Sequence, residues 1–153
     1  MGGPAPGIQL VHEADLIIRA KAVEYARPPS DPNTFTTGVP GSEVRFARLE
    51  AIRGPGASEL VLPGYLVDYD DFNDQKPPYN FVRPGGRAGS CFANSYKRGA
   101  EYLLFLKKTK TGALTVNWAA LAAVNEQLHS SDDPWLLWVR EQARTVDKSH
   151  GKK

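Results

Sequence analysis

The side chains best suited to chemistry in this chain are few and far apart. The sequence has one cysteine, Cys91, and three histidines that are separated by long stretches: His12, His129 and His150. Lys97 and Arg98 follow Cys91 and would favour a thiolate there. A nucleophile also needs a positioned base, and no histidine is spaced to act as one. We therefore expect structural or solvent-exposed histidines and no enzymatic activity. Cys91 can form no internal disulfide, which leaves a buried structural thiol, the simpler interpretation, or a bridge to another molecule.

A run of acidic residues is the sharpest local feature. Its aspartates offer oxygen ligands and form a weak candidate for a calcium site: Asp68, Asp70, Asp71 and Asp74. Their spacing does not match the twelve-residue calcium loop, which needs glycine at position six and glutamate at position twelve. A solvated strand end and turn explains the run more simply. No metal site and no cofactor are therefore predicted.

Aromatic and arginine residues interleave just after the acidic run. The predicted binding residues in this stretch are Tyr79, Phe81, Arg83, Arg87, Phe92 and Tyr96. Rings and guanidinium groups together are typical of protein recognition surfaces, and rings can also stack single-stranded bases. The alternative is that the loop folds over one end of the domain, so that about half of these rings form a small core of their own.

Composition narrows the choice of function. Nineteen basic and seventeen acidic side chains leave a net charge of +2, and this near balance argues against binding nucleic acid through bulk electrostatics. No run of residues approaches the roughly 18 apolar positions of a membrane span, and residues 1–7 lack the features of a signal peptide. We expect a flexible leader at residues 1–7, one domain at residues 8–146 and a disordered tail at residues 147–153.

The elements that must position these residues are mostly strands. The most concentrated apolar run lies within residues 98–108, where five apolar residues from Tyr102 to Leu106 predict a strand buried on both faces. Alternation predicts strands at residues 14–25 and 42–53, and a slip of register around Ala47 and Arg48 predicts a β-bulge. Further strands are predicted at residues 59–62 with 65–69 and at residues 113–118.

Loops and one helix complete the predicted elements. Proline-rich residues 28–41 should form an exposed hairpin loop, and residues 70–100 a long loop with one helical turn around residues 91–96. The sequence SSDDP at residues 130–134 predicts a helix start, with an aspartate cap and proline in the first turn. The helix at residues 134–146 carries an apolar stripe that needs a buried partner surface, for which its own barrel is the default: Trp135, Leu136, Val139 and Ala143.

Five strands followed by a C-terminal helix predict a mainly β domain, a small closed barrel of the oligonucleotide/oligosaccharide-binding type (OB-fold). Three phrases carry a family resemblance: ADLIIRAKAV at residues 14–23, LEAIRG at residues 49–54, and a lone cysteine ahead of GAEYLLFL at residues 99–106. Over about residues 12–120 the chain resembles bacterial members of the netrin-like group, whose best-known relatives are the tissue inhibitors of metalloproteinases.

The resemblance implies a non-enzymatic, extracytoplasmic barrel, periplasmic or secreted, that binds another protein. Those inhibitors chelate zinc through an N-terminal cysteine, and this chain has no cysteine before Cys91, so chelation by that route is not expected. We therefore predict a protein-interaction or inhibitor-like module that uses the loops at residues 28–41 and 70–98, with the partner and oligomeric state left open. The alternative is a single-stranded nucleic-acid binder, which the acidic run disfavours because it would repel phosphates.

Overall fold

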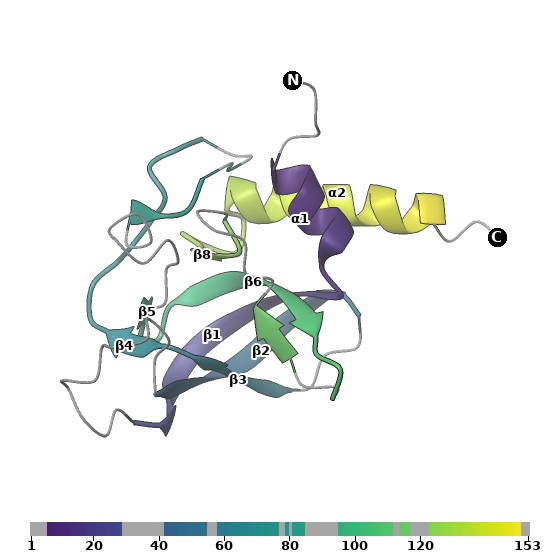
Figure 1. The fold of residues 1–153 in the computed structure, drawn as a ribbon. Helices are drawn as coiled ribbons and strands as arrows, with labels where there is room; N and C mark the ends of the chain where they lie inside the picture. The colour runs from purple at the N-terminus through teal and green to yellow at the C-terminus, as the bar shows by residue number, and fades with distance from the viewer. Residues whose placement is uncertain are drawn as a thin grey trace.

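The computed structural model describes residues 6–28, 42–54, 58–76, 79, 81–84, 95–111, 114–116 and 123–150 of the chain. The protein is mainly β with a C-terminal helix, as predicted (Figure 1). The elements are, in order, α1 (Pro6–Glu13), β1 (Leu16–Arg27), β2 (Glu43–Arg53), β3 (Glu59–Pro63), β4 (Tyr65–Val67), β5 (Ser95–Lys97), β6 (Glu101–Lys108), β7 (Leu114–Val116), β8 (Asn125–Gln127) and α2 (Pro134–His150).

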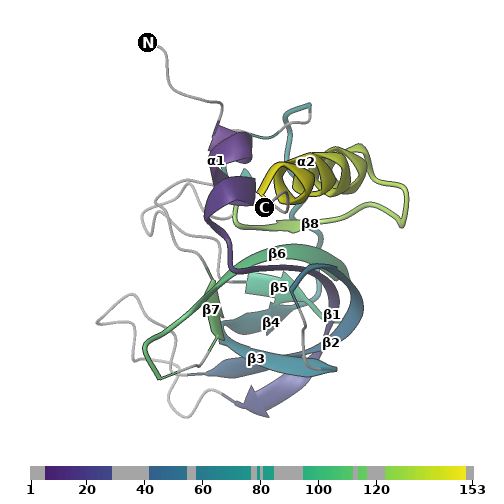
Figure 2. The ribbon, with the colours of Figure 1, turned by 90° about the vertical axis from the view of Figure 1, so that its right-hand side faces the viewer.

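The main sheet is antiparallel and follows the order β3-β2-β1-β6-β7, with β8 also paired to β6. It curls so strongly that its two end strands, β3 and β7, come into contact (Figure 2). No hydrogen-bonded ladder joins these two strands within the described residues. The prediction of a closed barrel with five strands is therefore wrong in two respects, because the sheet stays open and the chain forms more strands.

The sequence around the end strands explains why the sheet stays open. β3 ends at Pro63, which has no N–H group to donate to a further ladder. Beyond Gly64 the chain does not extend β3, because β4 turns away and pairs in parallel with β5 in a separate two-stranded sheet. β7 is also short, spanning only Leu114–Val116. Two short ends can approach each other without forming a continuous ladder.

β6 lies at the centre of the sheet, and the prediction that it is buried on both faces is confirmed. The side chains of its apolar run are all 0 % exposed: Tyr102, Leu103, Leu104, Phe105 and Leu106. β1 pairs along one edge, and β7 and β8 pair along the other. Figure 2 shows the two helices on one side of β6 and the curled sheet on the other.

The long hairpin pair of β1 and β2 contains the predicted bulge. Arg19 pairs with Glu50 and Ala20 with Arg48, so Leu49 is the extra residue of β2. The β-bulge predicted around Ala47 and Arg48 is thus confirmed, and it lies one residue further along the chain, at Leu49. A bulge bends its strand and increases the local twist, which contributes to the curl of the sheet.

α2 forms as the sequence predicted and continues beyond residue 146 to His150. Oδ1 of Asp133 accepts a hydrogen bond from the backbone N–H of Trp135 at 2.8 Å, and Pro134 is the first helical residue. The apolar stripe is buried within this domain, at 0 or 1 % exposed: Trp135, Leu136, Val139 and Ala143. Trp135 stacks on Trp138 and contacts Phe105 of β6, so α2 covers the sheet from one side.

α1 was not predicted and begins within the residues expected to form a flexible leader. Leu10 and Val11 are buried in the core, and α1 packs against α2. The guanidinium group of Arg53 donates hydrogen bonds to the carbonyl oxygens of Val11 and Ala14, which joins the end of α1 to the end of β2. The glycines and prolines around Pro6 hid this helix, although proline is favoured in a first helical turn.

β5 lies where a helical turn was expected around residues 91–96. Ser95 and Tyr96 are extended and pair with Tyr65 and Leu66 of β4, so the expected turn is wrong at these two positions. The rest of that turn, including Cys91, lies outside the described residues, as does the predicted loop at residues 28–41 beyond Pro28.

Candidate functional site

The structure buries three of the six predicted binding residues inside the protein. Tyr79 is 3 % exposed, and Arg83 and Tyr96 are 0 % exposed, while Phe81 is half-buried. Arg87 and Phe92 lie outside the described residues. The side chains of Tyr79, Arg83 and Tyr96 are therefore part of the scaffold in this structure. The two tyrosines pack into the main core, against Trp135 and Phe46 respectively, and not into a separate core of the loop.

Arg83 is the centre of a buried polar network that ties the segment of residues 70–84 to β8. Its Nη1 donates to Oδ2 of Asp71 at 2.8 Å and to the carbonyl oxygen of Ser95 at 2.9 Å. Its Nε donates to the carbonyl oxygen of Asn125 at 3.1 Å, and its backbone N–H donates to Oε2 of Glu126 at 3.0 Å. A buried cation needs this density of partners, because an uncompensated charge in the interior is costly.

Glu126 accepts hydrogen bonds through both carboxylate oxygens although it is 0 % exposed. Oε2 accepts from the backbone of Arg83, and Oε1 accepts from Nδ2 of Asn73 at 2.8 Å. Burial raises the pKa of Glu126 to about 7, and the charge of Arg83 and the bond from Asn73 oppose this rise only in part. Sequence analysis missed this residue, because an isolated glutamate in a short polar strand carries no pattern.

Two tyrosine rings flank Arg83 on its other sides. The guanidinium carbon lies 5.5 Å from the ring centroid of Tyr96 and 5.2 Å from that of Tyr102. Burial raises the pKa of Tyr102 to about 12 and also raises the pKa of Tyr96, so both phenols stay protonated. The hydroxyl of Tyr96 accepts a bond from Nδ2 of Asn125, and that of Tyr102 accepts one from the backbone of Lys97.

The acidic run is divided between these interactions and the surface. Asp71 pairs with Arg83, whereas Oδ1 of Asp70 accepts bonds from Nε2 of Gln127 at 2.8 Å and from Nζ of Lys97 at 3.1 Å. The bond from Gln127, followed by Lys97, lowers the pKa of Asp70. Asp68 and Asp74 are exposed. No group of three or more potential metal ligands occurs among the described residues.

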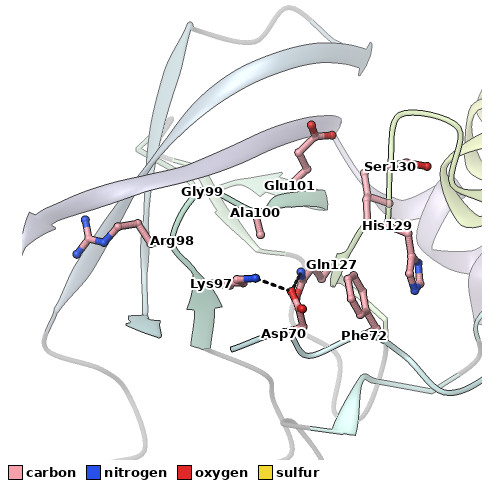
Figure 3. A pocket seen from close by; sticks show the side chains of 11 residues that line it. Asp70, Phe72, Lys97, Arg98, Gly99, Ala100, Glu101, Gln127, His129 and Ser130 are labelled. Carbon is pink, nitrogen blue, oxygen red and sulfur yellow. Dashed lines mark hydrogen bonds and ion pairs between the residues drawn. The ribbon is translucent and has the colours of Figure 1, made fainter. Parts of the chain in front are cut away.

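A surface pocket of about 340 Å³ lies beside this network (Figure 3). Three segments line it: Asp70 and Phe72, which follow β4; residues 97–101, from the end of β5 to the start of β6; and residues 127–130, from the last residue of β8 onward. Gly99 has a φ of +85°, and nothing lies within 4 Å of the position that a Cβ atom would take there. The surface above Gly99 is therefore open, with space for a bound group.

His129 and Phe72 form an aromatic pair at this pocket. Their rings stack with centroids 4.0 Å apart and an interplanar angle of 12°. Nδ1 of His129 lies 2.8 Å from Oδ2 of Asp133, the residue that caps α2. The imidazole is 51 % exposed and Asp133 is 1 % exposed. The only signal in the sequence was an aspartate four residues after the histidine, which by itself predicts little.

The fold and the pocket together define a broad class, a mainly β domain with a surface pocket that carries both charges and rings. No protein-family model matches the chain, and no curated protein matches it in sequence. In the part of the chain that the structure describes, no helix has both the length and the apolar character to cross a membrane. Function must therefore be inferred from the residues of the pocket.

Proposed function

We propose that this protein is a non-enzymatic, exported module that binds a segment of a partner protein in the pocket lined by Asp70, Phe72, residues 97–101 and residues 127–130. The observation that carries the proposal is the pocket itself. It brings an aromatic pair, several charged groups and a glycine with open space above it to one surface hollow. Partner sites typically combine a ring with polar groups on a rigid support.

The rigid support comes from the buried network behind the pocket. Gln127 donates to Asp70 in the pocket wall and accepts from the backbone N–H of Asp71 at 2.9 Å. Asp71 in turn pairs with Arg83, so the wall is held by groups that are themselves buried. A wall fixed in this way loses little conformational entropy when a partner binds, which favours affinity.

We also propose that the domain belongs to the netrin-like group of OB-folds. The two phrases at residues 14–23 and 49–54 lie on β1 and β2, which pair with each other, and the phrase at residues 99–106 includes most of the central strand β6. The strong curl of the sheet, with its end strands in contact, supports a partly open barrel of this type. The export of the protein is proposed on this resemblance alone.

Charge in the pocket favours a protein partner over a nucleic acid. Asp70 and Glu101 line the pocket together with Lys97 and Arg98, so the formal charges of the lining cancel. A pocket without an excess of positive charge offers little attraction to a phosphate backbone, which supplies most of the affinity in single-strand binding. The half-buried Phe72 ring alone would not replace that attraction.

The test is a selection of binding peptides from a random peptide library displayed on phage, with the purified protein as the target. We expect enriched peptides that bind the unaltered protein and lose at least about tenfold in affinity for the double variant Phe72→Ala with His129→Ala. The variant Leu137→Ala alters an exposed side chain of α2 and serves as the matched control, with affinity unchanged. Peptides that bind the double variant equally well would contradict the site, and salt-dependent retention on oligo-dT would favour the nucleic-acid alternative.

A further inference from the structure

A short stretch of chain after β4 joins the pocket to the buried network beneath it. Residues 70–73, which we call the wall segment, belong to no helix or strand. Their side chains alternate, because Asp70 and Phe72 line the pocket, whereas Asp71 and Asn73 bond to groups of the buried network. The positions of two pocket side chains therefore depend on what holds Asp71 and Asn73.

Side chains of β8 hold the wall segment in place. Oε1 of Gln127 accepts a hydrogen bond from the backbone N–H of Asp71 at 2.9 Å. Oε1 of Glu126 accepts one from Nδ2 of Asn73 at 2.8 Å. β8 itself is paired with β6 in the main sheet. A segment that side-chain bonds hold opens more readily than a strand inside a ladder, so local opening here would move the wall segment and leave β8 in place.

The network that holds the wall segment contains one cation and two carboxylates. Arg83 is fully buried, and its Nη1 donates to Oδ2 of Asp71 at 2.8 Å. Glu126 is also fully buried, and among the described residues it accepts bonds from neutral donors, the side-chain amide of Asn73 and the backbone N–H of Arg83. When both carboxylates are ionised they outnumber the cation. This excess of buried negative charge is costly unless Glu126 takes up a proton.

On its other sides Glu126 meets groups that do not compensate its charge. Burial raises the pKa of Tyr79 to about 12, so this phenol stays neutral. The charges of Asp133 and Glu126 both add to that rise, so the start of α2 brings a further negative charge to this region. Across the ladder with β6, Glu126 stands opposite the apolar Leu103.

Opening of the wall segment changes the proton affinity of Glu126. In the closed state burial, which Arg83 and Asn73 oppose only in part, raises the pKa of Glu126 to about 7. In the open state water reaches the carboxyl group, and its pKa returns toward the ordinary value of 4.5. Opening therefore releases a proton between these two values. A rise in pH favours the open state, and a fall in pH favours the closed state.

We propose that Glu126 is a proton-controlled latch of the pocket, whose ionisation releases the wall segment and with it Asp70 and Phe72. A partner then meets a formed wall in mildly acidic solution and a looser wall in mildly alkaline solution. This inference rests on the proposed function, because it describes how pH regulates the same pocket. If the open state exposes Glu126 fully, the equilibrium constant for opening rises about twentyfold from pH 5.5 to pH 7.5.

Amide hydrogen exchange of the free protein, followed by NMR, tests the latch without a ligand. The backbone N–H of Asp71 bonds to Gln127 and reports on the wall segment. The backbone N–H of Phe105 bonds to the carbonyl oxygen of Val124 and reports on the main sheet. Rates at pH 5.5 and pH 7.5 are divided by those of an unstructured chain at the same pH. We expect less protection for Asp71 than for Phe105 at both pH values, and an about twentyfold loss of protection at Asp71 from pH 5.5 to pH 7.5.

Variants and a direct titration assign this effect to Glu126. Glu126→Gln has no proton to release, so the protection of Asp71 should be the same at both pH values, whatever its level. The matched control Glu59→Gln removes an exposed carboxylate from β3 and should behave as the unaltered protein. In the unaltered protein the NMR signal of the side-chain carboxyl carbon of Glu126 should titrate near pH 7.

Three results would overturn the latch. Equal protection of Asp71 and Phe105 at both pH values would mean that the wall segment opens only when the whole protein unfolds. Protection of Asp71 that does not change with pH, or a Glu126 signal that titrates below pH 5, would mean that this carboxylate does not control the segment. The peptide selection decides the proposed function separately, because a wall segment that opens with pH beside a pocket that binds no peptide would confirm the latch and refute the binding site.

Discussion

Replacing Glu126 by glutamine should remove a pH dependence from the stability of the protein. Glu126 is fully buried, and burial raises its pKa to about 7 from the ordinary value of 4.5. Between pH 4.5 and about pH 7, Glu126 therefore holds a proton in the native protein that it has released in the unfolded chain. The free energy of unfolding must therefore fall as the pH rises through this window. Glutamine has no proton to release there, so the variant should lack this contribution.

The size of the effect follows from the difference between the two pKa values. One pKa unit corresponds to about 1.36 kcal/mol, so a rise from 4.5 to about 7 is worth roughly 3 kcal/mol in total. Part of the window lies below pH 5. Between pH 5 and pH 8 the free energy of unfolding of the unaltered protein, relative to that of Glu126→Gln, should fall by roughly 2–3 kcal/mol.

Urea denaturation followed by tryptophan fluorescence measures this difference, because Trp135 is buried in the core and Trp138 stacks on it. Both proteins are unfolded at pH 5, 6, 7 and 8. The matched control is Glu59→Gln, which removes an exposed carboxylate from β3 and should leave the pH dependence of the unaltered protein in place. A relative stability that is flat between pH 5 and pH 8 would refute the reasoning, because it would mean that Arg83 and Asn73 outweigh burial and hold the carboxylate ionised in the native protein.

The remaining predictions use the same denaturation assay. Arg83→Met removes the cation beside the half-buried Asp71 and the buried Glu126 and should lower the free energy of unfolding by about 3 kcal/mol or more. A loss below about 1 kcal/mol would contradict the network. Asp133→Ala removes the cap of α2 and should lower the free energy of unfolding by about 1–2 kcal/mol. The control Asp132→Ala changes an exposed side chain and should lower it much less. Equal losses for the two variants would argue against the cap. Leu103→Ala in the centre of β6 should lower the free energy of unfolding by about 2–5 kcal/mol, whereas Leu137→Ala, at an exposed position, should lower it by less than about 1 kcal/mol.

The parts of the fold that could be predicted are those whose signal is local. Five consecutive apolar residues predicted β6, because such a run needs cover on both faces. The aspartate and proline before Trp135 predicted the start of α2, because the cap and the first turn are local interactions. The slip in alternation predicted the bulge to within one residue of Leu49.

The candidate site could not be predicted, because it depends on which distant segments meet. Arg83 looked like a surface residue among glycines and prolines, and its burial depends on carboxylates that lie elsewhere in the sequence, Asp71 and Glu126. Phe72 and His129 form a pair only because β8 brings their segments together. β8 itself is made of polar residues that are buried by this network, so its sequence resembles a loop.

The open sheet has a similar explanation. Five strands in a suitable order favour a closed barrel, but closure depends on whether the end strands are long enough to form a ladder. The interruption at Pro63 and Gly64 was visible in the sequence. The sequence did not show that β4 would pair with β5 instead of extending β3, because β5 lies far along the chain.

The most direct test of the central claim, that the pocket is where a partner binds, is to map the binding of a selected peptide onto the protein by amide chemical shifts. We expect the largest shifts at Phe72, Lys97, Gln127 and His129, all of which line the pocket. Shifts that gather instead on the exposed surface of β2 and β3, around Leu49 and Val61, would contradict the claim and assign binding to the outer face of the sheet.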